Sequence, residues 1–200
     1  VPHQDGGGVA RIQVIEGAIT EIAFEGDGAD AARPFFHDVS GDAIASIGDL
    51  ERRLALAGDA PGLSVRARMA PDPDNLHWHR LVVTADLTPF EAYASLDNRG
   101  EESAGPWQFY TRGVANSFLQ ARDQAEIGVF TTPLTPEELT LGEVSYAVAF
   151  TDGARLRLSA SASRTHEDAE ISSTDVGGDS EAFSISYEFP IERTRRGGLW

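Results

Sequence analysis

Beyond Pro89 the sequence shows no helical period and consists of segments in which hydrophobic and polar residues alternate, separated by polar or glycine-bearing turns. Successive side chains of a β-strand point to opposite sides of a sheet, so this pattern predicts strands with one apolar and one polar face. Thr151-Asp152-Gly153 lies between two such strands and predicts a tight turn. The apolar positions are clearest at Val144, Tyr146, Val148 and Phe150, at Leu156, Leu158, Ala160 and Ala162, and at Phe183, Ile185, Tyr187 and Phe189.

The alternation fits two kinds of protein, a soluble antiparallel sheet packed on a core and a transmembrane β-barrel with lipid outside and water inside. Two details favour the barrel. The polar face carries Arg155, Arg157 and Glu188 beside small serines, which suits a hydrated lumen. Short turns also alternate with long polar connections such as Thr165 to Asp179. The soluble β-rich protein remains an alternative.

Composition excludes several classes of protein. No apolar run approaches the roughly 18 to 20 residues that a transmembrane helix needs, so any membrane crossing must use strands. The chain has no cysteine, which excludes a disulfide scaffold, a thiolate zinc site and a cysteine nucleophile. Its net charge of −16 and its lack of lysine argue against a nucleic-acid partner.

Residues 1 to 89 have a mixed pattern that predicts an α/β unit. Apolar strands are expected on both sides of Glu16-Gly17, and Pro61-Gly62 is expected to turn the chain from a helix into a further strand. The predicted strands are Val9 to Ile15, Ala18 to Phe24, Leu63 to Met69 and Leu76 to Asp86, and the predicted helices are Ala31 to Asp38 and Asp49 to Ala57.

No group of residues in the sequence indicates catalysis. His77-Trp78-His79 places two histidines on one side of a strand, but neither a cysteine nor an obvious third ligand accompanies them. There is no Gly-x-Ser-x-Gly elbow, and the Gly6-Gly7-Gly8 run lacks the Gly-Lys-Ser/Thr of a phosphate-binding loop. We therefore expect a protein that is not an enzyme and that has no cofactor and no metal site.

Four segments, in this order along the chain, resemble the transporters of two-partner secretion, the haemolysin-activation and filamentous-haemagglutinin secretion type. The most specific is Asp97-Asn98-Arg99-Gly100, which resembles the Asp-Asn-x-Gly segment on the family's first barrel hairpin. Val14-Ile15-Glu16-Gly17 resembles its Val-x-Glu-Gly junction between two POTRA domains. The other two segments are Gly48 to Asp74, like the helix, Pro-Gly turn and strand of the second POTRA domain, and Ile185 to Trp200, like a later strand end.

The resemblance implies an α+β POTRA domain of order β-α-α-β-β followed by antiparallel strands of a partial transmembrane β-barrel. Residues 1–17 would be the tail of a preceding POTRA domain, 18–89 a POTRA domain, and 90–200 the first barrel strands. About six strands cannot close a barrel, so the family pattern implies further strands. The sequence departs from that pattern by lacking the family's Val-Arg-Gly-Tyr-like motif and by placing Phe189 between Tyr187 and Pro190.

The implied function is secretion of a large exoprotein, haemolysin-like or adhesin-like, through the outer membrane of a Gram-negative bacterium. The POTRA domain would lie in the periplasm, and the expected partners are the exoprotein polypeptide and outer-membrane lipid, with no small-molecule substrate. One alternative is an outer-membrane-protein insertase of the same superfamily. The other is a soluble periplasmic β-rich binding module or enzyme without membrane contact.

Three groups of residues are candidates for these roles. A sheet edge could bind an extended client through backbone hydrogen bonds. Arginines on the polar strand faces could line a pore, or could instead solvate one sheet face or form internal ion pairs. The candidate client edge is Leu63, Ser64, Val65, Arg66, Ala67, Arg68 and Met69; the candidate pore residues are Arg112, Arg155, Arg157 and Glu188; the structural motifs are Glu16, Gly17, Asp97, Asn98 and Gly100.

Overall fold

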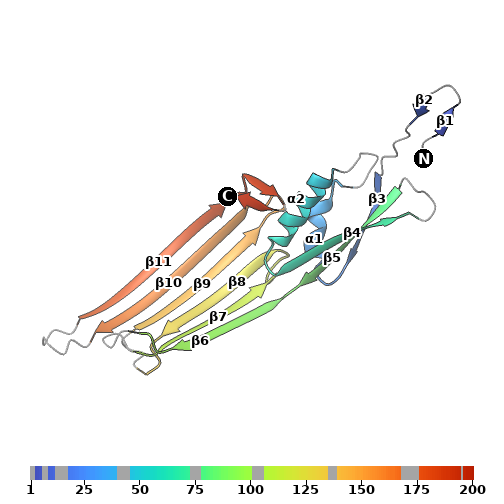
Figure 1. Ribbon diagram of the computed structural model, residues 1–200. Helices are drawn as coiled ribbons and strands as arrows, with labels where there is room; N and C mark the ends of the chain where they lie inside the picture. Colours follow the sequence, from blue (N-terminus) through green and yellow to red (C-terminus); the bar gives the residue numbers. More distant parts are fainter. Residues whose placement is uncertain are drawn as a thin grey trace.

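In the computed structural model of the chain, most described residues form antiparallel β-strands (Figure 1). The structure describes residues 3–5, 9–11, 18–39, 46–72, 78–100, 106–134, 139–167, 176–194 and 196–200. The N-terminal elements are β1 (His3–Asp5), β2 (Val9–Arg11), β3 (Ala18–Glu25), α1 (Ala29–Ala32), the 3-10 helix η1 (Arg33–Phe36), α2 (Ile47–Gly58), β4 (Leu63–Pro71) and β5 (Trp78–Leu87). They are followed by β6 (Phe90–Asp97), β7 (Gln108–Asn116), β8 (Asp123–Thr131), β9 (Leu139–Ala149), β10 (Arg155–Glu167), β11 (Val176–Glu188), β12 (Glu192–Thr194) and β13 (Gly197–Leu199).

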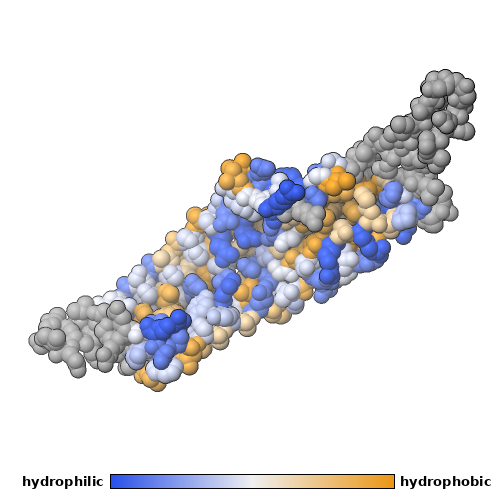
Figure 2. All heavy atoms as spheres, in the orientation of Figure 1, coloured by the Kyte–Doolittle hydropathy of each residue, from blue (hydrophilic) through white to orange (hydrophobic). Residues whose placement is uncertain are grey.

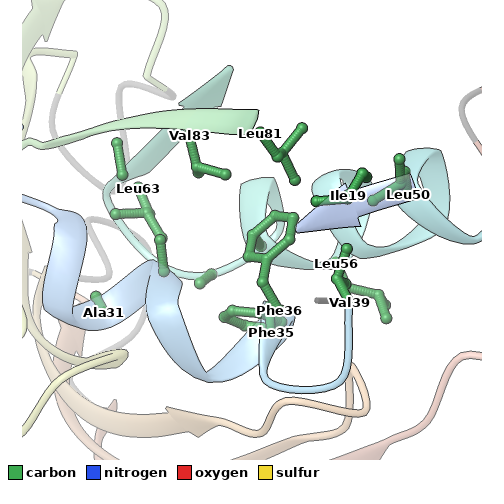
Figure 3. Close-up of a cluster of buried hydrophobic side chains, with 14 residues drawn as sticks. Ile19, Ala31, Phe35, Phe36, Val39, Leu50, Leu56, Leu63, Leu81 and Val83 are labelled. Atoms are coloured by element: carbon green, nitrogen blue, oxygen red, sulfur yellow. The ribbon is translucent and has the colours of Figure 1, made fainter. Parts of the chain in front are cut away.

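Residues 18–87 form a unit, called the α/β unit below, in which α1, η1 and α2 pack on one side of a three-stranded sheet. The strand order is β3-β5-β4, with β3 parallel and β4 antiparallel to the central β5. Phe36 and Val83 are almost fully buried between the helices and the sheet (Figure 3). The hydrophobic core of the chain therefore lies here; its buried members are Ile19, Ala31, Ala32, Phe35, Phe36, Val39, Leu50, Leu56, Ala57, Ala60, Leu63, Leu81, Val83 and Ala85.

The helix α2 follows the predicted amphipathic pattern and begins two residues before the predicted start. Leu50, Leu56 and Ala57 are buried on its inner face. Asp49 lies in its first turn, where a negative charge is favourable, and accepts a hydrogen bond of 2.8 Å from Arg53 one turn later. Packing of this face on β4 and η1 holds the helix against the sheet.

The predicted helix over Ala31 to Asp38 is confirmed as helical over Ala31 to Phe36, but only its first two residues are α-helical. The structure has a four-residue α-helix, Ala29–Ala32, that continues as the 3-10 helix Arg33–Phe36. Pro34 stands at the start of η1, and since proline has no backbone N–H to donate, it ends the α-helical hydrogen bonding there. The predicted strand Val9 to Ile15 corresponds to β2 only over Val9–Arg11, and residues 12–17 lie outside the described part.

Residues 90–188 form a six-stranded antiparallel sheet whose strands follow one another in the order of the chain, β6 to β11. The predicted strands and the predicted tight turn are confirmed. In that turn Asp152 accepts a hydrogen bond of 2.9 Å from the Ala154 N–H, and Gly153 has a φ of +93°. Figure 1 shows the two short turns, β7–β8 and β9–β10, at the end of the sheet nearest the α/β unit.

Among the described residues, no helix combines the length and the hydropathy that crossing a membrane requires.

Candidate functional site

The strand registers divide the six-stranded sheet into two faces of opposite chemistry. Residues directly opposite each other in an antiparallel pair point to the same side, and successive residues point to opposite sides. One row of opposed residues is Ile127, Val144, Ala160 and Phe183, and the adjacent row is Glu126, Ser145, Ser159 and Ser184. The first row belongs to what we call the apolar face, and the second to the polar face.

The apolar face is exposed. Val144 is 51% and Phe183 80% exposed, and no helix of the described chain packs over them. Leu158 and Ile185 are exposed in the same way. The largest apolar side chains on this face are Phe90, Leu96, Phe109, Ile127, Val129, Val144, Tyr146, Val148, Leu156, Leu158, Phe183, Ile185 and Tyr187.

The boundary of this apolar surface crosses the strands obliquely. On β10 the apolar residues run from Leu156 to Ala162, and Arg164 follows on the same face. At the position level with Arg164, β6 and β7 still carry Leu96 and Phe109. A flat apolar layer crossed by tilted strands produces this shift from strand to strand.

The polar face carries a network of charged and amide side chains with Glu126 near its centre. Arg112 Nη2 donates a hydrogen bond of 2.9 Å to Glu126 Oε2, and Arg157 Nη1 lies 3.7 Å from the same oxygen. Arg157 Nη1 also donates to Ser145 Oγ at 2.9 Å. In Figure 2 hydrophilic residues lie over the middle of the visible face of the sheet.

The four candidate pore residues all fall on the polar face. Arg112 and Arg157 join the network around Glu126, and Glu188 lies opposite Arg155 at the end of β10 and β11. Arg155 instead donates a hydrogen bond of 2.8 Å to the backbone oxygen of Asp59 in the α/β unit. A role of these residues in a pore remains a prediction.

Sequence reasoning missed the acidic and amide partners of these arginines. Asn116 is buried and donates to Glu91 Oε1 at 3.0 Å, and Gln124 Nε2 donates to Asn116 Oδ1 at 2.8 Å. The alternation in β7 and β8 could have placed them, since each of these residues has an apolar or small neighbour on the opposite face. Their distances to one another depend on strand register, which alternation alone does not give.

The candidate client strand lies at a sheet edge. In the described structure β4 pairs only with β5, so its other side presents backbone groups that β5 does not use. Arg66 and Arg68 point to the outer face of this sheet, and Val65 and Ala67 pack against the core on the inner face. The prediction that this edge binds a client stays a prediction.

The Asp97-Asn98-Arg99-Gly100 segment begins the connection from β6 to β7. Asp97 Oδ1 accepts a hydrogen bond of 3.1 Å from the Arg99 N–H, and the Gly100 N–H donates to Pro106 O at 3.1 Å. At the described start of this connection an Asp side chain therefore holds the backbone, and Asn98 does not have the positive φ that its type would permit. Glu16 and Gly17 lie outside the described residues.

A set of contacts joins the α/β unit to the end of the six-stranded sheet. Asp59, the residue that ends α2, accepts two hydrogen bonds from Arg193 of β12, at 2.6 and 2.8 Å. This pairing raises the pKa of the Arg193 guanidinium above its ordinary value. A Cβ at Gly153 would lie 2.6 Å from Leu56 and 2.7 Å from Pro190, so the β9–β10 turn fits closely against α2.

No cluster of three or more potential metal ligands occurs in the described part of the chain. His79 lies on β5, and His77 falls outside the described residues.

No protein-family model and no curated protein matches the sequence. Solved structures do match. CdiB from Escherichia coli aligns with a TM-score of 0.71 and 19% identity, over 96% of this chain and 37% of that one. BamA from Haemophilus ducreyi lacking POTRA domains 1–3 aligns with a TM-score of 0.62 and 12% identity, over 96% of this chain and 37% of that one. CdiB from Acinetobacter baumannii aligns with a TM-score of 0.57 and 13% identity, over 90% and 35%.

The chain thus spans little more than a third of the length of these structures and shares the fold of that part.

Proposed function

We propose that the chain is part of an outer-membrane protein transporter that secretes a large exoprotein. The six-stranded sheet would contribute to a transmembrane β-barrel, and the α/β unit would be a periplasmic POTRA domain that captures the client polypeptide. No enzymatic step is involved. The observation that carries the proposal is the separation of large apolar side chains and charged side chains between the two faces over the middle of the sheet, with the apolar face uncovered.

Lipid accounts for the apolar face better than water does. Soluble proteins rarely expose a continuous apolar surface larger than a few hundred Å². Here large apolar side chains are exposed on five of the six strands, all except β7, and Phe90, Ile127 and Phe183 are among them. The oblique boundary from Leu96 on β6 to Arg164 on β10 fits a flat membrane crossed by tilted strands.

A hydrated channel accounts for the polar face. Serines and paired charges such as Arg112 and Glu126 are usual on the lumen side of outer-membrane barrels. Ion pairs between Arg112, Glu126 and Arg157 would leave this surface polar without a large excess of one charge.

The order β3, α1 with η1, α2, β4, β5 supports the identification of the α/β unit as a POTRA domain, because that domain has the order β-α-α-β-β. The unit also sits directly against the end of the sheet where the short turns lie, which in outer-membrane barrels is the periplasmic end (Figure 1).

Secretion is the leading function because two of the similar structures are of CdiB, a two-partner secretion transporter, and because Asp97 to Gly100 resembles the motif of that family. Insertion of outer-membrane proteins is the second candidate, supported by the similarity to BamA.

The membrane assignment can be tested with single cysteines, since the 200 residues contain none of their own. Leu158→Cys and Ser159→Cys are neighbours on β10 that point to opposite faces. We expect a thiol reagent confined to lipid to modify the cysteine at 158, and a membrane-impermeant aqueous reagent to modify the one at 159. Equal modification of both by the aqueous reagent, in a chain that stays monomeric without detergent, would contradict the proposal and favour a soluble protein.

A further inference from the structure

The edge strand β4 carries a local positive charge that contrasts with the rest of the chain. Residues 63–71 contain Arg66 and Arg68 and no acidic residue, although the sequence as a whole has 32 acidic and 16 basic residues. The two side chains are 71% and 64% exposed. They lie two residues apart and therefore point to the same face, beside the open edge.

The carboxylates near these arginines lie on β5 and β3, on the side of β4 away from its open edge. Arg66 pairs with Asp86 of the central strand at 2.8 Å, and Arg68 lies 3.8 Å from Glu25 of β3. A guanidinium has five N–H donors, so one such contact leaves donors for a second carboxylate. Exposed pairs of this kind contribute little to stability and give way easily to another partner.

The opposite face of the same edge is apolar. Val65 and Ala67 pack against the core, and Met69 is about half exposed at the end of that row. A strand added beside β4 would therefore meet arginines on one side and aliphatic side chains on the other, in strict alternation.

We propose that β4 selects client segments in which acidic and apolar residues alternate, with two carboxylates at positions i and i+2 opposite Arg66 and Arg68. This inference rests on the proposed function and names the client feature that its capture step recognises. Backbone hydrogen bonds to the edge would supply affinity for any extended segment, and the two arginines would supply the preference.

The size of the preference follows from cross-strand pairing. An opposite-charge pair across two strands contributes roughly 0.2–1 kcal/mol relative to a neutral pair, so two pairs should change affinity about 2-fold to 30-fold. Because both arginines are exposed, the preference should weaken as salt is raised from about 50 to 500 mM.

The experiment titrates the full chain with three peptides of equal length in which valine alternates with aspartate, with serine or with lysine. We expect the aspartate peptide to bind tightest and the lysine peptide weakest. The double variant Arg66→Glu/Arg68→Glu should reverse that order. Arg80→Glu is the matched control, since Arg80 lies on the same face of the central strand, paired with Glu21 and away from the edge, and should leave the order unchanged.

Two further variants separate the charge preference from capture itself. In an antiparallel pair successive N–H groups point to opposite sides, so either Ser64 or Val65 directs its N–H away from β5. Proline at that residue removes the N–H that an added strand would use and leaves the β4–β5 pairing intact. Circular dichroism identifies which proline variant keeps the native fold. If that proline variant loses binding but the unmodified chain binds all three peptides equally, edge capture stands and the charge preference is overturned. Failure of every peptide to bind would count against edge capture and so against the proposed function.

Discussion

The regions around the two sheets of this chain contain similar hydrophobic residues, which are buried in one region and exposed in the other. In the three-stranded sheet one face is covered by α1, η1 and α2, and Phe36 is 1% exposed. In the six-stranded sheet no helix of the described chain covers either face, and Phe183 is 80% exposed. The α/β unit therefore buries its apolar residues against its own helices. The six-stranded sheet can bury its apolar face only against something other than the described chain.

This difference implies different sources of stability. Burial against other parts of the same chain contributes the same amount in water and in detergent. Burial against lipid contributes only when lipid is present. Substitutions in the two sheets should therefore respond differently to the surroundings of the protein.

The largest expected effect is that of Phe36→Ala, which removes a fully buried ring from the core. It should destabilise the α/β unit by about 3–5 kcal/mol, with or without a membrane. Phe183→Ala is the control, since the ring it removes contacts little of the chain. Amide hydrogen exchange of β5 measures the loss of stability caused by Phe36→Ala. If both variants raised the exchange of β5 equally, the contrast between a buried and an exposed phenylalanine would be wrong.

Val144→Arg should cost about 2–4 kcal/mol in lipid, because it places a charge on the apolar face near the middle of the sheet. Ser161→Arg lies on the polar face opposite Glu143 and should be nearly neutral. Urea titration of the protein folded into lipid vesicles measures both. In a soluble protein Val144→Arg would change an exposed residue by less than about 0.5 kcal/mol, and that result would rule out the lipid-facing assignment.

Much of the separation into an apolar and a polar sheet face was predictable from the sequence, because the alternation of residue types is visible within each strand. Val144 to Phe150 and Leu156 to Ala162 alternate so regularly that their faces follow from residue type alone. The helix α2 was predictable for the same reason, since Leu50, Leu54 and Ala57 recur at helical spacing.

What could not be predicted depends on contacts between residues far apart in the chain. The Arg112–Glu126 pair requires the β7–β8 register, and Asp59 with Arg193 requires the placement of α2 against β12. The 3-10 helix at Pro34 was missed for a local reason. Its flanking residues have an α-helical pattern, and only Pro34, which lacks a backbone N–H, indicates the change to a 3-10 helix.

A further contact sharpens the comparison, because Asp59 at the end of α2 pairs with Arg193 of β12, the short strand that follows the six-stranded sheet. Asp59→Asn removes the charge from a half-buried pair with two hydrogen bonds and should weaken this contact by about 1.5–3 kcal/mol. Hydrogen exchange at the C-terminal turn of α2 should increase. Asp49→Asn in the first turn of the same helix is the control. It should leave the C-terminal turn unchanged, because the described partner of Asp49 is Arg53, one turn along the helix.

The smallest effects concern ion pairs on the polar face of each sheet, and they test how accessible each face is to solvent. Glu126 is 13% exposed and lies between Arg112 and Arg157, so Glu126→Gln should cost about 1–2 kcal/mol and leave two arginines without their shared partner. Asp86 is 53% exposed, so Asp86→Asn should lower the free energy of unfolding by only about 0–1 kcal/mol. At about 0.5 M salt this difference should disappear, because salt screens the ion pair. Unfolding measured at low and high salt distinguishes the two sites. Equal and fully screened effects would mean that water reaches Glu126 as freely as Asp86, so that strand packing on the polar face does not restrict solvent around its charges.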